Sequence, residues 1–350
     1  MAGVYKNARS ARPLAPYAPF PASNPAPVAQ LLGMCSAAAE TPLADAARLA
    51  DGAGLGALWI KDERGRMGLG SFKALGAAYV IAHEAAERDP SPGPATLGSR
   101  TYVTASAGNH GMSVTAGAAI FGARAVIYIA DTVPEAFARR LAAKGAEVRR
   151  EGADYAASMA AAQTAAQENG WTLLSDSSWE GYTDLPHRLM EGYLQLAAEA
   201  AAQVPHVPSH IFLQAGVGGM AAALAAHFRD VWGDAPVIIV VEPDAAPALL
   251  ESVRAGRVLM TDGPVSSMGR LDCKEPSAIA LNGLARDADW FVTLTDAEVE
   301  ARLPDLAAAG LETTASGGAG VAAALSPRLQ GPLGLGRASH VLCILSEGPE

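Results

Sequence analysis

Cysteine and positive charge are scarce in this chain of 350 residues. The three cysteines, Cys35, Cys273 and Cys343, stand far apart without a Cys-x-x-Cys spacing. They therefore predict neither a metal site nor a disulfide framework, and they fit a reduced cytoplasmic protein. Lys and Arg number 26 against 36 Asp and Glu, a formal net charge of −10. Because nucleic acids and anionic membranes bind basic patches, neither is expected as a partner.

Aromatic residues and long apolar runs are also few. Aromatics make up 6% of the chain. No apolar stretch of about 18 or more residues is free of charged and turn residues, so we expect no membrane span. The first 32 residues contain six prolines and no continuous apolar segment, which argues against a secretory signal.

What the chain does contain is a regular alternation of β-branched runs and longer Ala-rich runs, with half of its residues hydrophobic. The expected strands are 57–62, 101–106, 124–130, 146–151, 172–176, 210–216, 236–243 and 340–348. The expected helices are 72–88, 109–121, 134–145, 154–168 and 184–203. Strand–helix alternation of this kind predicts parallel sheets with right-handed crossovers, and hence an α/β fold.

The strongest single motif is "LQAGVGGM" (213–220), where a strand ends in glycines that open an Ala-rich helix. Converging backbone N–H groups and the positive end of a helix dipole would bind a phosphate well there. The spacing is neither GxxxxGK[ST] nor GxGxxG, so a nucleotide is disfavoured. Tight strand-to-helix packing, which also needs small residues, remains an alternative.

Lys73 follows the glycine-rich turn "GLGSF" (68–72) and stands beside Phe72. Partial desolvation there would lower the pKa of the lysine and make the neutral amine accessible for Schiff-base formation. The alternative is an ordinary solvated lysine. A reactive lysine together with a phosphate-binding turn is the minimum needed to hold pyridoxal 5′-phosphate (PLP).

Three further segments contain candidate site residues. "TASAGNHGMSV" (104–114) places Asn109 and His110 where a helix begins, so that backbone amides could bind a carboxylate and Asn109 could donate to a ring oxygen. A helix cap at Asn109 with a solvated His110 is the alternative. Asp176 and Ser346 each end a predicted strand and are candidate site residues. The alternative is that Asp176 is a surface aspartate and Ser346 only a strand terminus.

Taken together, these segments resemble the fold-type-II PLP-dependent enzymes, and among them the diaminopropionate ammonia-lyases most closely. The resemblance covers about residues 40–348 and includes "IKDERGRMGLGSFKALGAAY", "TASAGNHG", "SDSSWEGYTDLPHRLMEGY", "QAGVGGM", "CKEPS", "ASGGAGVAAAL" and "SEG". The Lys73 and Asn109 motifs are shared with threonine dehydratases and the tryptophan synthase β-subunit. The segment after Asp176 is the part that points to the ammonia-lyases.

The resemblance implies a fold and a set of roles. It implies two parallel-sheet α/β domains, a large one of residues 1–84 and 191–350 and a small, mobile one of residues 85–190, in a homodimer. Lys73 and Asp176 are implied as catalytic residues, Lys73 being both the Schiff-base lysine and a general base. The implied cofactor-binding residues are Phe72, Lys73, Asn109, Gly216, Val217, Gly218, Gly219, Met220 and Ser346. The implied substrate-carboxylate loop consists of Ser106, Ala107, Gly108 and His110.

The implied reaction is α,β-elimination on a small L-amino acid such as L-2,3-diaminopropionate, giving pyruvate and ammonia. Asp176 would assist the β-amino leaving group. One position departs from the family, which has an aspartate, associated with the D-isomer, where this chain has Ala107. We therefore expect action on L-isomers. An L-serine, L-threonine or hydroxyaspartate dehydratase, and a PLP-binding protein without catalysis, remain alternatives.

Overall fold

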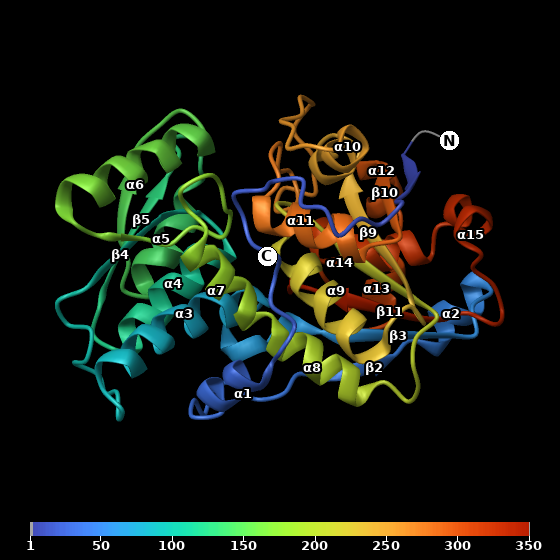
Figure 1. Ribbon diagram of the computed structural model, residues 1–350, viewed down its shortest axis with the longest axis horizontal. Helices are drawn as coiled ribbons and strands as arrows, with labels where there is room; N and C mark the ends of the chain where they lie inside the picture. Colours follow the sequence, from blue (N-terminus) through green and yellow to red (C-terminus); the bar gives the residue numbers. More distant parts are fainter. Residues whose placement is uncertain (1–2, 350) are drawn as a thin grey trace.

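The computed structural model describes residues 3–349 and contains two β-sheets flanked by helices (Figure 1). The large sheet has the order β1 (Val4–Lys6), β10 (Trp290–Leu294), β9 (Val237–Pro243), β8 (His210–Gln214), β11 (His340–Leu345), β3 (Ala57–Asp62) and β2 (Leu43–Asp45). The small sheet has the order β6 (Glu147–Arg150), β5 (Arg124–Ile129), β4 (Thr101–Ala105) and β7 (Thr172–Leu173). Among the described residues no helix is long and apolar enough to cross a membrane.

The helices connect and cover these strands. They are α1 (Ala26–Leu32), α2 (Ala47–Ala53), α3 (Lys73–Arg88), α4 (Asn109–Ile120), α5 (Glu135–Ala143), α6 (Tyr155–Asn169), α7 (Asp184–Gly192), α8 (Leu194–Gln203), α9 (Gly219–Trp232), α10 (Ala248–Ala255), α11 (Ala278–Asp287), α12 (Asp296–Glu300), α13 (Leu303–Ala308), α14 (Ala315–Ala324) and α15 (Pro327–Leu333), with a 3₁₀ segment η1 (Glu63–Gly68).

The sheet topology confirms the predicted α/β class. All neighbouring strands of the small sheet run parallel, as do the five central strands of the large sheet from β10 to β3. The short edge strands β1 and β2 are antiparallel to their neighbours. The carboxyl ends of the parallel strands therefore open onto one edge of each sheet, where α/β proteins place their ligands.

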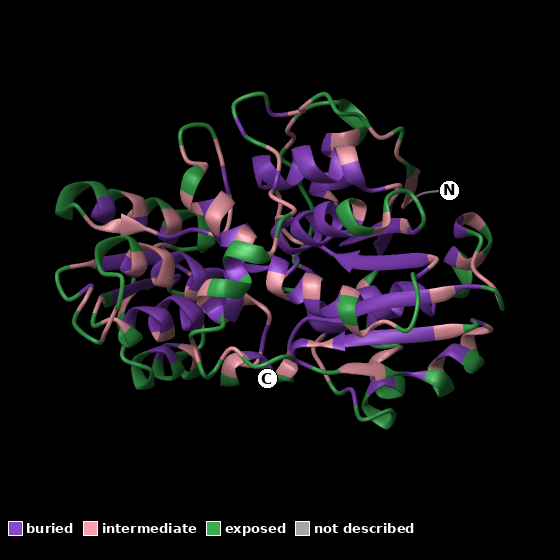
Figure 2. Cartoon of the chain, turned by 60° about the horizontal axis from the view of Figure 1, so that its bottom comes forward, coloured by how far each residue is buried: buried purple, intermediate pink, exposed green. Residues whose placement is uncertain are grey.

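The large sheet is buried on both faces, as its apolar runs predict (Figure 2). Side chains alternate between the faces along each strand. Helices α8, α9 and α11 cover one face, against Ile211, Leu213, Ile238, Val240, Leu342 and Ile344. Helices α2, α14 and α15 cover the other, against Phe212, Ile239, Val241, Val341, Cys343 and Leu345.

Some predicted elements differ in extent. The predicted helix 184–203 is two helices, α7 and α8, separated at Tyr193, whose buried ring packs edge-on against Phe72 at 5.0 Å between centroids. The strand predicted over 172–176 ends at Leu173. Strands β1, β2 and β10 were not predicted. The first two are three-residue edge strands that exist through pairing with their neighbours.

Two glycines let α3 and α7 pack closely. A Cβ atom on Gly76 would lie 2.9 Å from the side chains of Leu189 and Tyr193, and one on Gly192 would lie 2.5 Å from the Leu75 carbonyl oxygen. Helix α3 also packs against α4 and so lies beside the small sheet. The strands of that sheet fall between residues 101 and 173, inside the predicted small domain. The boundaries of that domain, and its mobility, stay predictions.

A buried ionic cluster anchors the segment that leads to Lys73. Lys61 at the end of β3 and Arg66 in η1 both bind Glu199 of α8, with nitrogen–oxygen distances of 2.7 Å. Arg66 also binds Glu63 at 2.7 Å, so two cations face two carboxylates. Burial alone would raise the pKa of Glu199, but hydrogen bonds and charges from Arg66 and Lys61 lower it to about 2.

Replacing Glu199 by Gln should destabilise the fold, because the change leaves two buried cations facing one carboxylate. We expect a loss of about 3–5 kcal/mol in the free energy of unfolding at pH 7, measured by urea denaturation. Glu251→Gln, which breaks the exposed Arg254–Glu251 pair, is the control and should cost less than about 1 kcal/mol.

The same pair of proteins tests the pKa shift. The pKa of Glu199 is lower in the folded state than its ordinary value of 4.5. Its contribution to stability is therefore complete above pH 4.5 and is lost as the pH falls from 4.5 toward about 2. The difference between wild type and Glu199→Gln should shrink over this range, and a difference independent of pH would contradict the assignment.

Candidate active site

Lys73 is the first residue of α3, and the turn before it is docked on the end of β11. The Phe72 amide donates to the Ser346 carbonyl oxygen at 3.1 Å, and the Gly348 amide donates to the Gly70 carbonyl oxygen at 3.0 Å. Gly70 has a φ of +82°, a left-handed conformation that glycine adopts without strain. These contacts bring Phe72, Lys73 and Ser346 to the same edge of the large sheet.

The Lys73 ammonium group forms an ion pair with the carboxylate of Asp176, which follows β7 of the small sheet. Their side chains are only 19% and 17% exposed, so neither is the solvated surface charge that the sequence left open. A cation at a helix amino terminus is unfavourable by itself, and Asp176 compensates it. The pair thus joins the ends of strands from the two sheets.

The predicted direction of the Lys73 pKa is wrong. Burial does act to lower it, but the neighbouring Asp176 carboxylate, which also accepts a hydrogen bond from the amine, outweighs burial and raises the pKa. For Asp176, burial acts to raise the pKa, while Lys73 and His110 lower it well below its usual range. At neutral pH both groups are therefore charged.

The glycine turn after β8 forms a cradle at the amino terminus of α9. Gly218 has a φ of +96°, and a Cβ atom there would lie 3.0 Å from Leu249 and Ala280. A Cβ atom on Gly216 would lie 2.9 Å from the Arg270 carbonyl oxygen. Its N-cap residue, Gly218, has no side chain that could cap α9, and the first N–H groups of a helix have no partner inside it. Tight packing and the backbone amides of a helix amino terminus thus occur together, which fits a phosphate.

The remaining cup residues and Ser346 lie close to this cradle. The Val217 carbonyl oxygen accepts from the Ser277 amide at 3.0 Å, while Gly219 and Met220 begin α9. Ser346 is buried at the end of β11, which is the neighbour of β8 in the sheet. The next strand, β3, leads through η1 to Lys73. Three adjacent strand ends therefore present the glycine cradle, Ser346 and Lys73.

The loop between β4 and α4 faces this edge from the small sheet. Asn109 does not cap α4, whose N-cap is Gly108, and instead its amide donates to the Glu347 carboxylate. A Cβ atom on Gly108 would lie 3.9 Å from Arg270 Nε, and Arg270 in turn binds Glu347 at 2.9 Å. Within the same loop the Ser106 hydroxyl accepts from the Gly108 amide at 3.3 Å, and Ala107 is half-buried.

His110 is buried and is not the solvated neighbour that the sequence left open as an alternative. Its Nε2 lies 2.7 Å from the carbonyl oxygen of Leu174, two residues before Asp176. Burial lowers the pKa of the imidazole, against the opposing effect of Asp176. The structure thus brings all the residues that the sequence singled out to one region between the two sheets.

Three residues of this region were missed by sequence reasoning as site residues. Tyr193 is buried, and its pKa is raised by burial and by Asp176 against the effect of Lys73. Glu347 and Arg270 are described above. Tyr193 and Glu347 belong to the quoted motifs "MEGY" and "SEG", which could have suggested them. Cys273 also lies here, because a Cβ atom on Gly216 would be 2.9 Å from its sulfur, and burial and Asp176 raise its thiol pKa to about 12.

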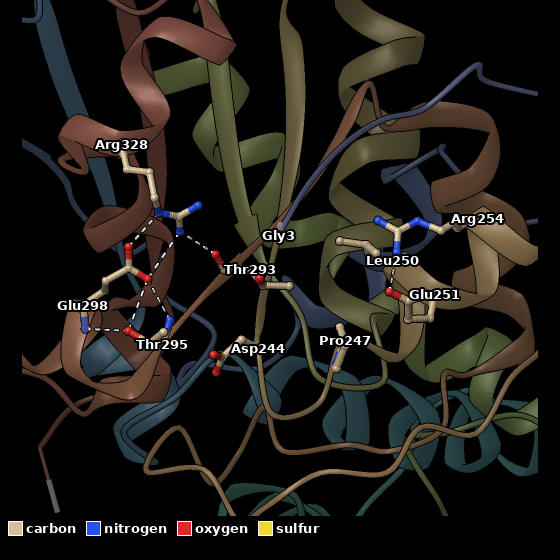
Figure 3. Close-up of a pocket in the computed structure, with 10 residues that line it drawn as sticks. All are labelled: Gly3, Asp244, Pro247, Leu250, Glu251, Arg254, Thr293, Thr295, Glu298 and Arg328. Carbon is tan, nitrogen blue, oxygen red and sulfur yellow. Dashed lines mark hydrogen bonds and ion pairs between the residues drawn. The ribbon is translucent and has the colours of Figure 1, made fainter. Parts of the chain in front are cut away.

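A separate surface cavity of about 590 Å³ lies at the carboxyl ends of β9 and β10 (Figure 3). None of the residues singled out by the sequence lines it. Arg328 there binds Glu298 at 2.8 Å, and Arg254 binds Glu251 at 2.7 Å, so these four charged groups are paired with one another. The cavity is distinct from the region around Lys73.

Comparison with known proteins agrees with this geometry. Residues 35–347 match the family described as pyridoxal-phosphate dependent enzyme. The diaminopropionate ammonia-lyase of Salmonella typhimurium is 33% identical over 74% of this chain and 69% of its own length, and that of Escherichia coli is 33% identical over 73% and 68%. A crystal structure of the E. coli enzyme superimposes with a TM-score of 0.86 at 29% identity, covering 99% of this chain and 93% of that one. The chain therefore belongs to the family of pyridoxal-phosphate dependent enzymes, alongside diaminopropionate ammonia-lyases.

Proposed function

We propose that this protein is a PLP-dependent ammonia-lyase that converts a small L-amino acid such as L-2,3-diaminopropionate into pyruvate and ammonia. The observation that carries the proposal is the Lys73–Asp176 ion pair, which lies beside an uncapped glycine cradle and opposite an amide-rich loop. This arrangement supplies a reactive amine, a phosphate site and an acidic group near one another. We further propose that the enzyme is a cytoplasmic homodimer, as the family resemblance suggests.

The residues proposed to hold the cofactor divide its recognition between them. Lys73 would carry its aldehyde carbon, the backbone of 216–220 its phosphate, Ser346 its pyridine nitrogen and Asn109 its phenolic oxygen. Phe72 would pack beside it, next to Tyr193. When bound, PLP supplies an electron sink for negative charge developing on the α-carbon of the substrate.

The rest of the chemistry belongs to the side chains and the loop. The backbone amides of Ser106 to His110, at the amino terminus of α4, are proposed to bind the substrate carboxylate. Lys73, once its amine is released and neutral, would take the α-proton. Asp176, which pairs with the Lys73 ammonium group in this structure, would instead attract the protonated β-amino group of the substrate and remain beside it as ammonia departs.

This role of Asp176 favours an amino over a hydroxyl leaving group. A carboxylate attracts an ammonium group, whereas a hydroxyl leaving group needs a proton, which the carboxylate form of Asp176 cannot donate. The dehydratase alternative is separated by stoichiometry, because diaminopropionate yields two ammonia molecules per pyruvate and serine yields one. If the wild-type enzyme prefers serine or threonine to L-2,3-diaminopropionate, the proposed substrate is wrong and the enzyme is a dehydratase.

Ala107 should make the enzyme selective for the L-isomer, because the loop lacks a carboxylate that could act as a base on the opposite face of the substrate. We expect kcat/KM for D-2,3-diaminopropionate to be at least about 100-fold below that for the L-isomer, measured by pyruvate formation. Ala107→Asp should raise the activity on the D-isomer, and the uncharged control Ala107→Asn should not. Comparable wild-type turnover of the two isomers would refute this prediction.

Lys73 should be the point of covalent cofactor attachment. After the protein is loaded with PLP and reduced with borohydride, the pyridoxyl mass should lie on the peptide that contains Lys73. In Lys73→Ala this peptide should carry no pyridoxyl label. The kcat of this variant should be lower by at least about 1000-fold, because the same amine serves as the base. Lys144→Ala, on an exposed helix end, is the control. A pyridoxyl label on another lysine would contradict the assignment.

A further inference from the structure

The segment that carries Asp176 extends beyond the sheet. The last backbone contact of this segment with β4 is made by the Leu174 amide, which donates to the Val103 carbonyl oxygen at 2.9 Å. After this point side chains replace the strand as partners. The Tyr182 hydroxyl donates to the Leu173 carbonyl oxygen at 2.8 Å and accepts from the Ser175 amide at 3.1 Å. Because Leu174 and Ser175 are fully buried, each of their backbone groups needs such a partner.

His110 supplies the partner for the Leu174 carbonyl oxygen, at 2.7 Å from its Nε2. A carbonyl oxygen can only accept, so Nε2 must carry the proton and Nδ1 the lone pair. Nδ1 is buried and has no hydrogen-bond partner among residues 3–349. The geometry therefore corresponds to the neutral tautomer protonated at Nε2, which donates toward Leu174.

This hydrogen bond links two parts of the site that lie far apart in the sequence. His110 is the last residue of the loop proposed to bind the substrate carboxylate, and Leu174 is two residues from Asp176. His110 is also close enough to Asp176 and Lys73 to interact with both charges. A shift of the imidazole would displace the backbone that aims the Asp176 carboxylate.

We propose that His110 is a positioning residue, which through its hydrogen bond to the Leu174 carbonyl holds the Asp176 carboxylate against the β-substituent of a substrate bound at the 106–110 loop. The inference rests on the proposed function, in which Asp176 acts on a β-amino leaving group. It assigns to the His110 side chain a task separate from the backbone amides of the same loop.

The inference predicts a dependence on the leaving group. β-Chloro-L-alanine also gives pyruvate by elimination, but its leaving group is chloride, which departs without help from a carboxylate. The informative quantity is thus the ratio of kcat/KM for L-2,3-diaminopropionate to kcat/KM for β-chloro-L-alanine, with pyruvate measured in both cases. Asp176→Asn should lower this ratio by at least about 100-fold.

His110→Leu, which removes the donor, should lower the same ratio by about 10- to 100-fold. His110→Gln should restore it to within about threefold, because the glutamine amide nitrogen reaches as far as Nε2 and donates in the same way. His110→Asn, with a shorter amide, should behave like His110→Leu and serves if the apolar variant fails to fold. The matched control is Ser158→Ala. It removes another buried hydrogen bond in the small-sheet region, from the Ser158 hydroxyl to the Glu151 carbonyl oxygen, and should leave the ratio unchanged.

A second measurement needs neither substrate nor cofactor. Amide hydrogen exchange of the peptide covering 173–178 should be faster in His110→Leu than in the wild type, with and without PLP, and close to wild type in His110→Gln. Ser158→Ala should leave this peptide unaffected. The readout reports on the backbone of the Asp176 segment itself.

The possible outcomes separate the two proposals. If Asp176→Asn lowers the ratio while His110→Leu lowers both activities equally, the positioning role is overturned and the proposed function stands. If Asp176→Asn leaves the ratio unchanged, the leaving-group role of Asp176 and the inference built on it both fail. If the wild type forms no pyruvate from L-2,3-diaminopropionate, the proposed function fails. If hydrogen exchange of the 173–178 peptide is the same in His110→Leu as in the wild type, the positioning role of His110 is overturned as well.

Discussion

The ion pair between Lys73 and Asp176 is the contact on which the geometry of this site depends, because it spans the two sheets. Lys73 begins the helix that follows β3 and η1 of the large sheet, and Asp176 follows β7 of the small one. Each charge is largely removed from water, and an unpaired charge in such a place would be costly. The relative placement of the two sheets is therefore coupled to the charge state of both residues. The pKa of each residue is in turn shifted by the charge of the other.

The surrounding polar contacts strengthen this arrangement from several sides. The cluster of Lys61, Arg66, Glu63 and Glu199 anchors the segment before Lys73. Glu347, which pairs with Arg270, also accepts a hydrogen bond from Asn109 of the small-sheet loop. A buried polar network rigidifies a site when every member is satisfied. Here the charges are balanced within each group, so the cost of burying them is offset by specific partners.

Small residues give the backbone its close approaches. Gly76 and Gly192 let α3 and α7 pack together, so that Tyr193 lies beside Phe72 and Lys73. Gly216 and Gly218 let the turn after β8 pass close to Arg270 and Leu249. Glycine at these four positions is thus a requirement of the close packing around this edge.

Local sequence patterns were sufficient for the α/β class, most strands, helices α3 to α9 and the residues at strand ends, because alternation, glycine turns and buried runs are local properties. The β10 strand was missed although "WFVTL" is rich in β-formers, and the edge strands β1 and β2 were missed because three residues carry too little pattern. The motifs also identified the family before any contact was known.

What only the tertiary structure decided are the interactions between distant residues. Lys73 and Asp176 are 103 positions apart, and Asn109 and Glu347 are 238 apart. The raised pKa of Lys73, opposite to the prediction, follows from a carboxylate that no local pattern places beside it. The orientation of the His110 imidazole likewise depends on its hydrogen bond to the Leu174 carbonyl oxygen, 64 positions away. Sequence neighbours determine which element a residue joins, whereas its charge state and its hydrogen bonds depend on the chain segments that folding brings next to it.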